Sequence, residues 1–188
     1  TDCPQREKNG WTADNFLTAE LSLLNFDTAP YFLNKWVYDV IDNIREDGRI
    51  SGIMPDWGWG YDDWIGPVWD SSIFSIAEYL YDYTGETDHI KLLWPVWKRY
   101  LDYLKTREEA DGLPTYGIGD WVYLNVATPT EFTTPCFYYK DYCVMTRFAS
   151  LMGEDPAPYA AKAEAIRNAI NAKWFNCETD LYANGSQA

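Results

Sequence analysis

The feature that most constrains the fold of this chain is the recurrence of apolar residues at helical spacing, between connections of two different lengths. This periodicity predicts six helices, over residues 14–26, 28–47, 67–84, 87–107, 134–152 and 156–174. One representative stripe, in residues 87–107, consists of Ile90, Leu93, Trp94, Trp97, Leu101 and Leu104. Strand-like alternation is nowhere sustained, so the sequence predicts an all-α fold.

The connections between the predicted helices fall into a short class and a long class. The short joins are residues 25–28, 84–87 and 153–156, and the long ones, rich in Gly, Trp and Asp, are 48–66 and 108–133. This alternation is typical of helical hairpins whose long loops gather at one rim, where the N-terminal segment 1–13 would join them. Loops held by a rigid scaffold commonly carry function. Six helices of this kind would form an open arc, about half of a closed ring.

Composition excludes several classes of partner. The net charge of −14 argues against binding to nucleic acid or to an anionic membrane, since both require clustered Lys and Arg. No apolar run reaches the length of a membrane span. The four cysteines form no CxxC pair and the chain has one histidine, so we expect neither a zinc site nor a cofactor. Free thiols leave the compartment open, whether cytoplasmic, periplasmic or secreted, and the oligomeric state is equally open.

The segment 2–14 concentrates charged residues in a stretch without periodicity. Hydrolysis of a glycoside requires a protonated carboxylic acid beside the leaving oxygen, and an inverting enzyme uses a second carboxylate to activate water. Asp2 and Asp14 would favour the protonated form of Glu7 if the loop folds them together, and Arg6 and Lys8 would oppose it.

A simpler interpretation of the same segment is a charged loop that precedes a helix, with Thr12 or Asp14 as the N-cap. The sequence pattern by itself leaves both interpretations open.

Several short motifs in this chain are similar to those of a known family. The pieces are Asp2-Cys3-Pro4, Arg6-Glu7, Gly10-Trp11 and Asp14, then Pro67-Val68-Trp69-Asp70, Tyr83-Thr84-Gly85-Glu86, Gly119-Asp120-Trp121 and Tyr182 to Gln187. Together and in this order they resemble the catalytic domain of glycoside hydrolase family 78, the bacterial α-L-rhamnosidases. The first motif is the most specific, and the resemblance spans the whole chain.

The resemblance implies an (α/α)6 toroid, of which residues 1–188 would be a part that continues beyond residue 188. It also implies an inverting, metal-independent hydrolysis of terminal α-L-rhamnose. Glu7 takes the place of the family's general acid, and Asp2 and Asp14 would hold sugar hydroxyls. Some members place the acid one residue later, where this chain has Lys8, but the short spacing to Gly10-Trp11 supports Glu7.

The family's general base is a glutamate in the second half of the toroid, and no position for it exists in this chain. We therefore expect the isolated segment to be inactive. Two alternatives remain open: a toroid glycosidase that acts on another sugar, and a non-catalytic sugar-binding module.

The tryptophans suit a sugar site, because an indole buries the apolar faces of a 6-deoxy sugar while polar groups bind its hydroxyls. By the resemblance, Trp11, Trp69 and Trp121 would wall the pocket, and Arg6 and Asp120 would also bind substrate. Packing at a helix end is the alternative for Trp69. The tryptophans on helical stripes, expected in the core, are Trp36, Trp94, Trp97 and Trp174. Trp57, Trp59 and Trp64 would either extend the pocket towards an aglycone or pack in an interface.

Two further features give no functional prediction. The spacing of Asp56, Asp62 and Asp63 does not match an EF-hand loop. His89, next to a predicted helix start, is expected to be a surface or capping residue rather than a catalyst.

Overall fold

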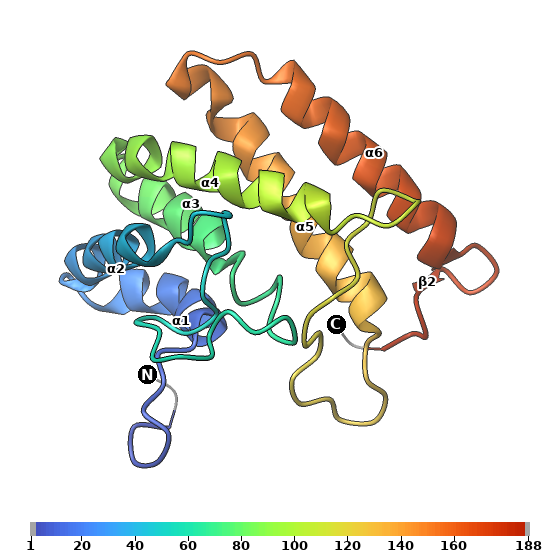
Figure 1. Cartoon of the computed structure of the whole chain (residues 1–188), viewed down its shortest axis with the longest axis horizontal. Helices are drawn as coiled ribbons and strands as arrows, with labels where there is room; N and C mark the ends of the chain where they lie inside the picture. Colours follow the sequence, from blue (N-terminus) through green and yellow to red (C-terminus); the bar gives the residue numbers. More distant parts are fainter. Residues whose placement is uncertain (1–2, 187–188) are drawn as a thin grey trace. The chain divides into compact units, whose positions relative to one another are not determined.

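The computed structural model describes residues 3–186 and is built from helices, as the apolar periodicity predicts (Figure 1). The six α-helices are α1 (Thr12–Asn25), α2 (Ala29–Asn43), α3 (Ser72–Thr84), α4 (Asp88–Thr106), α5 (Thr130–Ala149) and α6 (Ala157–Trp174). A 3₁₀ turn, η1 (Ser150–Met152), follows α5, and a small hairpin of β1 (Phe175–Asn176) and β2 (Leu181–Tyr182) follows α6. The predicted all-α class is therefore confirmed.

The described residues divide into two compact units. The first contains residues up to Asp62 together with Trp69–Tyr103, and the second contains Asp63–Val68 together with residues from Leu104 onward. In the first unit, α1 packs against α3, and α2 packs against both.

Helix α3 is the buried element of the first unit. A run of its residues is almost completely inaccessible to solvent, namely Ser72, Ile73, Phe74, Ser75, Ile76 and Ala77. A stretch of helix that is buried on every side requires other elements to surround it. Phe74 stacks on Trp97 of α4 with ring centroids 4.9 Å apart and an interplanar angle of 14°.

Helix α4 buries the stripe that its sequence predicts. All of its members are at most 5% exposed: Ile90, Leu93, Trp94, Trp97, Leu101 and Leu104. Pro95 lies inside this helix and does not delay its start at Asp88. The 3.6-residue period thus identified the core face of α4 correctly.

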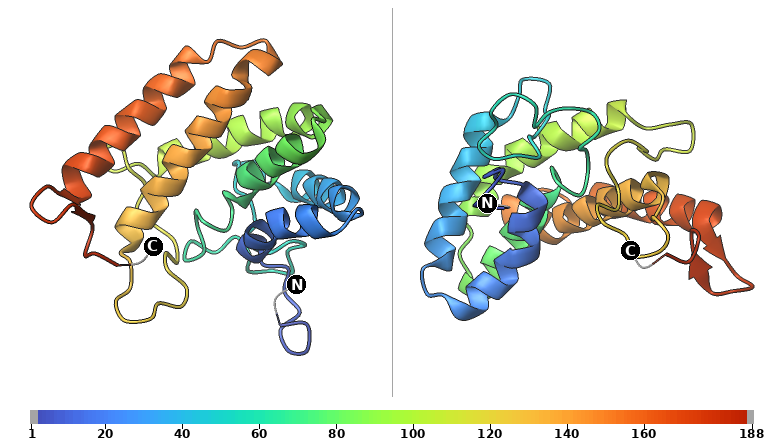
Figure 2. Two further views of the ribbon diagram at one scale, coloured as in Figure 1. Left: turned by 180° about the vertical axis from the view of Figure 1, so that it is seen from behind. Right: turned by 90° about the horizontal axis from the view of Figure 1, so that it is seen from below.

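The second unit is built around a helical hairpin of α5 and α6, which lie side by side in both views (Figures 1 and 2). Gly153, with φ of 73°, ends the first arm in a left-handed conformation that suits glycine. The Asp155 carboxylate then accepts a hydrogen bond at 2.9 Å from the amide of Ala157, the first residue of α6.

Several predicted boundaries were wrong. Helix α5 begins at Thr130 rather than at 134, because the amides of Phe132 and Thr133 bond to the Pro129 carbonyl and form a turn ahead of Pro135. Helix α3 begins five residues later than predicted, and α2 ends at Asn43 rather than near Gly48. The β1–β2 hairpin was not predicted, since two-residue strands are too short to show alternation.

The interpretation of His89 as a surface or capping residue was also wrong. Its side chain is 3% exposed, and Nε2 lies 2.9 Å from the Ala77 carbonyl oxygen on α3. Burial lowers the pKa of His89, because the low-polarity surroundings disfavour the charged imidazolium. Among the described residues, no helix is long and apolar enough to cross a membrane.

Two adjacent leucines of α4 give a matched test of this core. Leu93 is fully buried, whereas its neighbour Leu92 is 40% exposed. Leu93→Ala should lower the free energy of unfolding by about 2–5 kcal/mol, because it leaves a cavity. Leu92→Ala should change it by less than about 1 kcal/mol. Urea denaturation followed by circular dichroism measures both, and equal losses would contradict this assignment of the core face.

Candidate active site

The loop that precedes α1 holds the Glu7 side chain against an indole. The Trp11 Nε1 donates to Glu7 Oε2 at 3.4 Å, and Arg6 donates to Glu7 Oε1 at 2.7 Å. The Glu7 side chain is 35% exposed and that of Arg6 is 75% exposed. Glu7 therefore carries a carboxyl group that is fixed on both oxygens and still accessible to a ligand.

Four indoles form a continuous row beside this carboxyl group. Trp69 and Trp11 meet edge to face with centroids 6.3 Å apart, and Trp11 and Trp59 do so at 5.2 Å. Trp57 extends the row, with its centroid 5.5 Å from that of Trp59 and an interplanar angle of 90°. Edge-to-face contacts of this kind suit the electrostatics of aromatic rings, so each indole restrains the orientation of the next. We refer to Trp69, Trp11, Trp59 and Trp57 as the indole row.

Backbone pairing connects the acidic loop to the long connection after α2. The Met54 amide donates to the Gly10 carbonyl at 2.7 Å, and the Thr12 amide donates to the Gly52 carbonyl at 3.0 Å. A Cβ atom on Gly10 would lie only 2.0 Å from the Met54 carbonyl oxygen, so this approach requires glycine.

Thr12 adds a second connection with its side chain. The hydroxyl oxygen lies 2.5 Å from the Trp69 carbonyl oxygen and 3.1 Å from that of Gly52. A hydroxyl has one proton to donate. Because the Thr12 amide already serves Gly52, we assign the hydroxyl proton to Trp69. Thr12 is 1% exposed, so these bonds are shielded from water.

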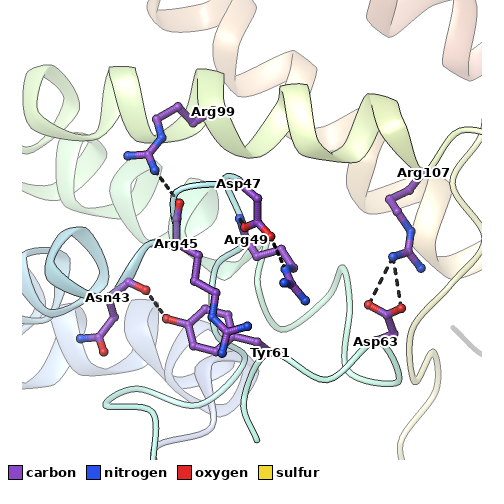
Figure 3. Close-up of polar contacts among 8 residues, drawn as sticks. All are labelled: Asn43, Arg45, Asp47, Arg49, Tyr61, Asp63, Arg99 and Arg107. Carbon is purple, nitrogen blue, oxygen red and sulfur yellow. Dashed lines mark hydrogen bonds and ion pairs between the residues drawn. The ribbon is translucent and has the colours of Figure 1, made fainter. Parts of the chain in front are cut away.

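The long connection itself is fixed to the helices around it (Figure 3). The Tyr61 hydroxyl donates to the Asn43 carbonyl at the end of α2, and the Arg45 guanidinium lies over the Tyr61 ring, 3.8 Å from its centroid. Arg99 of α4 donates to the Arg45 carbonyl. Arg49 pairs with Asp47 at 2.8 Å. Burial raises the pKa of Asp47, but hydrogen bonds from Arg49 and the positive charges of Arg49 and Arg45 lower it below its ordinary value.

Asp14 lies in the first turn of α1 and is exposed. Together with Trp11 it lines a groove of about 740 Å³ between α1 and α2, to which Lys35 and Asp39 also contribute. Asp2, the other aspartate expected to hold the sugar, lies outside the described residues.

Asp70 follows the row tryptophan Trp69 and is a buried carboxyl group. It is 5% exposed, and its Oδ1 has no hydrogen-bond partner. Burial raises the pKa of Asp70 to about 7, and hydrogen bonds from Tyr100 and the backbone oppose this rise only in part. Val68, two residues earlier, has φ of 112°, a strained conformation for a β-branched residue.

Two predicted site residues, Asp120 and Trp121, belong to the second unit. Asp120 is half-buried, and its Oδ2 accepts from the Thr128 amide at 3.3 Å and the Thr128 hydroxyl at 3.2 Å. Trp121 is 65% exposed in the long loop before α5. The structure therefore brings together Glu7, Trp11 and Trp69, and places Asp120 beside Trp121 in the other unit.

Two acidic residues of the long connection have protein partners. Asp56 accepts from the Gly60 amide at 2.7 Å, and Asp63 pairs with Arg107 at 3.2 Å. Within residues 3–186, no group of three or more His, Cys, Asp or Glu side chains is arranged to hold a metal ion. The four cysteines form no disulfide.

Sequence reasoning missed the contacts of three side chains that hold this region together. They are Thr12, Asn9 and Asp70. It considered Thr12 only as an N-cap, whereas Thr12 is the first residue of α1 and Trp11 precedes it as the N-cap. Asn9 is 8% exposed, and its Oδ1 accepts from Trp57 Nε1 at 2.9 Å. The available signal was weak: a small polar residue on each side of a Gly-Trp pair, with partners more than 40 residues away. Of the stripe tryptophans, Trp174 is only half-buried.

Comparison with known proteins gives a consistent match. Residues 1–188 match the model of a family described as the bacterial alpha-L-rhamnosidase 6 hairpin glycosidase domain. The six helices supply half of the helices of a six-hairpin domain, so the predicted (α/α)6 class is confirmed.

Individual relatives agree with the family. The α-L-rhamnosidase of Streptomyces avermitilis is 28% identical over 180 residues, which cover 93% of this chain and 17% of the relative. The solved α-L-rhamnosidase from Dictyoglumus thermophilum is 30% identical with a TM-score of 0.86, covering 94% of this chain and 20% of that one. The Streptomyces avermitilis structure in complex with L-rhamnose is 25% identical with a TM-score of 0.83, covering 91% and 16%. The chain thus spans a fifth or less of the length of these relatives.

Asp70 predicts a pH dependence of stability. Because its pKa in the folded protein, about 7, lies above the ordinary 3.8, the folded protein binds one more proton than the unfolded chain between these values. Its contribution to stability is therefore full below about pH 4 and is lost as the pH rises through 7, by at most about 1.4 kcal/mol per pH unit. Asp70→Asn should remove this decline.

The test compares thermal or urea unfolding of both proteins at pH 5 and pH 8. The stability of Asp70→Asn relative to the parent should increase at the higher pH. Asp27→Asn, an exposed aspartate, is the control and should show no such increase. Parallel pH curves for the parent and Asp70→Asn would refute the prediction.

Thr12 permits a conservative test of the connection to Trp69. Thr12→Val keeps the shape and removes the hydroxyl, and should lower the free energy of unfolding by about 1–3 kcal/mol. Thr12→Ser keeps the hydroxyl and should lose less. Thr18→Val, which removes an exposed hydroxyl bonded within α1, should have an effect below about 0.5 kcal/mol. Similar losses for Val and Ser at position 12 would show that the hydroxyl is unimportant.

Proposed function

Because the chain belongs to the bacterial α-L-rhamnosidase six-hairpin glycosidase domain family, we propose that it forms part of an enzyme that hydrolyses terminal α-L-rhamnose from rhamnosides. The observation that supports this most directly is the Glu7 carboxyl group, held by the indole N–H of Trp11 beside the indole row. An accessible acid beside apolar rings suits a reaction at a sugar carbon.

In the proposed reaction, Glu7 protonates the glycosidic oxygen as the bond to the sugar breaks. Proton transfer by a positioned acid contributes about 10²–10⁴-fold to the rate. Arg6 pairs with the ionised Glu7 carboxylate and fixes its position, and this ion pair is given up when Glu7 takes up the proton that it donates. Water attacks from the opposite face of the ring and inverts the configuration, with activation by a second carboxylate about 6.5–9.5 Å from the first.

We place that second carboxylate in a part of the same domain outside residues 1–188. The length of the relatives supports this, since the chain spans only 17% of one and 20% of another. It follows from the proposal that residues 1–188 alone bind sugar weakly and do not turn it over.

Rhamnose has a methyl group and apolar C–H faces, which suit the indoles of Trp11 and Trp69. Trp69 is 7% exposed, so it supports Trp11 more than it offers a surface of its own. Asp14 is exposed, as a carboxylate that binds sugar hydroxyls must be. On the strength of their motifs, we also assign Asp2 and Asp120 to binding of the substrate and Trp121 to the wall of the pocket.

The proposal predicts a leaving-group signature for Glu7→Gln in the full-length protein that carries this chain. With methyl α-L-rhamnoside, whose leaving group needs a proton, kcat should fall by about 10²–10⁴-fold. With 2,4-dinitrophenyl α-L-rhamnoside, whose leaving group departs without one, the loss should be at least tenfold smaller. KM should change little, because glutamine keeps the shape of the site.

Glu46→Gln, an exposed glutamate in the same unit, should leave both rates intact. Equal losses of kcat on the two substrates would show that Glu7 is not the general acid. A panel of nitrophenyl glycosides identifies the sugar, and preference for another glycoside would replace rhamnose in the proposal. Binding of rhamnose without turnover by the full-length protein would indicate a non-catalytic module.

A further inference from the structure

Trp57 exposes a large apolar surface at the end of the indole row. Its side chain is 65% exposed, whereas Trp69 at the other end is 7% exposed. Full burial of a tryptophan removes 150–250 Å² from water at about 25 cal/mol per Å², so leaving an indole uncovered forgoes a large stabilising contribution. An exposed indole indicates a binding surface when the rest of the chain holds it in place.

Trp57 is held by a buried polar group. Its Nε1 donates to Oδ1 of Asn9 at 2.9 Å, and Asn9 is 8% exposed. Its ring also meets Trp59 edge to face at 90°. The hydrogen bond fixes one edge of the indole and Trp59 fixes another, so the orientation of the exposed face is determined.

The chain on both sides of Trp57 is restrained as well. Asp56 accepts from the Gly60 amide at 2.7 Å, and the Gly52 amide donates to the Gly60 carbonyl at 2.8 Å. Tyr61 is anchored to Asn43 and lies under Arg45 (Figure 3). Trp57 is therefore an exposed ring on a fixed loop, which is the form expected of a pre-organised binding platform.

The position of Trp57 near Glu7 relates this ring to the leaving group of a substrate. The Asn9 that orients Trp57 is two residues from Glu7, and the indole that contacts Glu7 is two rings away in the same row. A general acid acts on the oxygen that joins the sugar to its leaving group. A fixed ring close to the acid is thus available to the leaving group.

We propose that the exposed indole of Trp57, oriented by Asn9, binds the leaving group of the substrate and determines which leaving groups are preferred. This rests on the proposed function, with Glu7 as the acid. The ligand must offer a flat apolar face, which either an aromatic ring or the C–H face of a second sugar supplies. Asn9 is a positioning residue, since it acts through Trp57.

The test compares three rhamnosides in the full-length protein: 4-nitrophenyl α-L-rhamnoside, a rhamnosyl-glucose disaccharide and methyl α-L-rhamnoside, whose leaving group has no ring. In Trp57→Ala, kcat/KM for a ring-bearing substrate relative to the methyl glycoside should fall by about tenfold, mostly through KM. Trp57→Phe, which keeps a ring without the N–H, should recover part of the ratio. Tyr31→Ala, at an exposed aromatic residue of α2 in the same unit, should not change it.

Each outcome has a distinct meaning. A fall confined to the nitrophenyl substrate supports an aromatic ligand, and a fall confined to the disaccharide supports a sugar. An unchanged ratio, or an equal loss on all three substrates, overturns the inference. Glu7→Gln has the opposite signature, with the greatest loss on the methyl glycoside, so failure of the acid assignment is seen separately. If the parent protein hydrolyses no rhamnoside, both proposals fall.

Discussion

The structure of the candidate site depends on the pairing of residues 10–12 with residues 52–54. Two backbone hydrogen bonds and the Thr12 hydroxyl bring three separate segments together: the acidic loop, the tryptophan-rich connection and the turn that carries Trp69. None of the three has regular structure that would fix it alone. Because Thr12 is also the first residue of α1, the same contacts attach the site to the helical scaffold. A shift at Gly10 or Thr12 would therefore move Glu7 and the indoles together.

This arrangement separates the groups that provide stability from those exposed to a ligand. Helices α3 and α4 bury their apolar stripes, and the stack of Phe74 on Trp97 joins them. The connections carry Glu7 and Trp57, both of which remain accessible. Asp70 lies at the boundary between the two, since it follows a row tryptophan and bonds to Tyr100 of α4. A carboxyl group buried at this point lowers the stability of the folded protein at neutral pH, in a turn that also contains the strained Val68.

Helical periodicity was sufficient to predict the fold class and the core face of α4, because both depend on spacing within one helix. The family motifs led to Glu7, Trp11 and Trp69 for a similar reason, since each is a local pattern. His89 was assigned wrongly because the group that buries it, the Ala77 carbonyl, belongs to a different helix. The contacts of Thr12, considered only as an N-cap, and of Asn9, given no role, were missed because their partners lie 57 and 48 residues away. Local sequence indicates a chemical group, but only the packed chain shows which partner it meets.

The exposure of the indole row increases along its length, and this gradient explains how a largely apolar site remains both stable and open. Trp69 is buried and bonded through its backbone to Thr12, so it anchors the row to the core. Trp11 and Trp59 are half-buried and transmit that restraint through edge-to-face contacts. Trp57 is mostly exposed, and its hydrogen bond to the buried Asn9 provides the restraint that burial provides for Trp69. Because the buried end of the row already restrains the exposed ring, less conformational entropy is lost when a ligand binds to that ring. This is the physical basis of pre-organised binding.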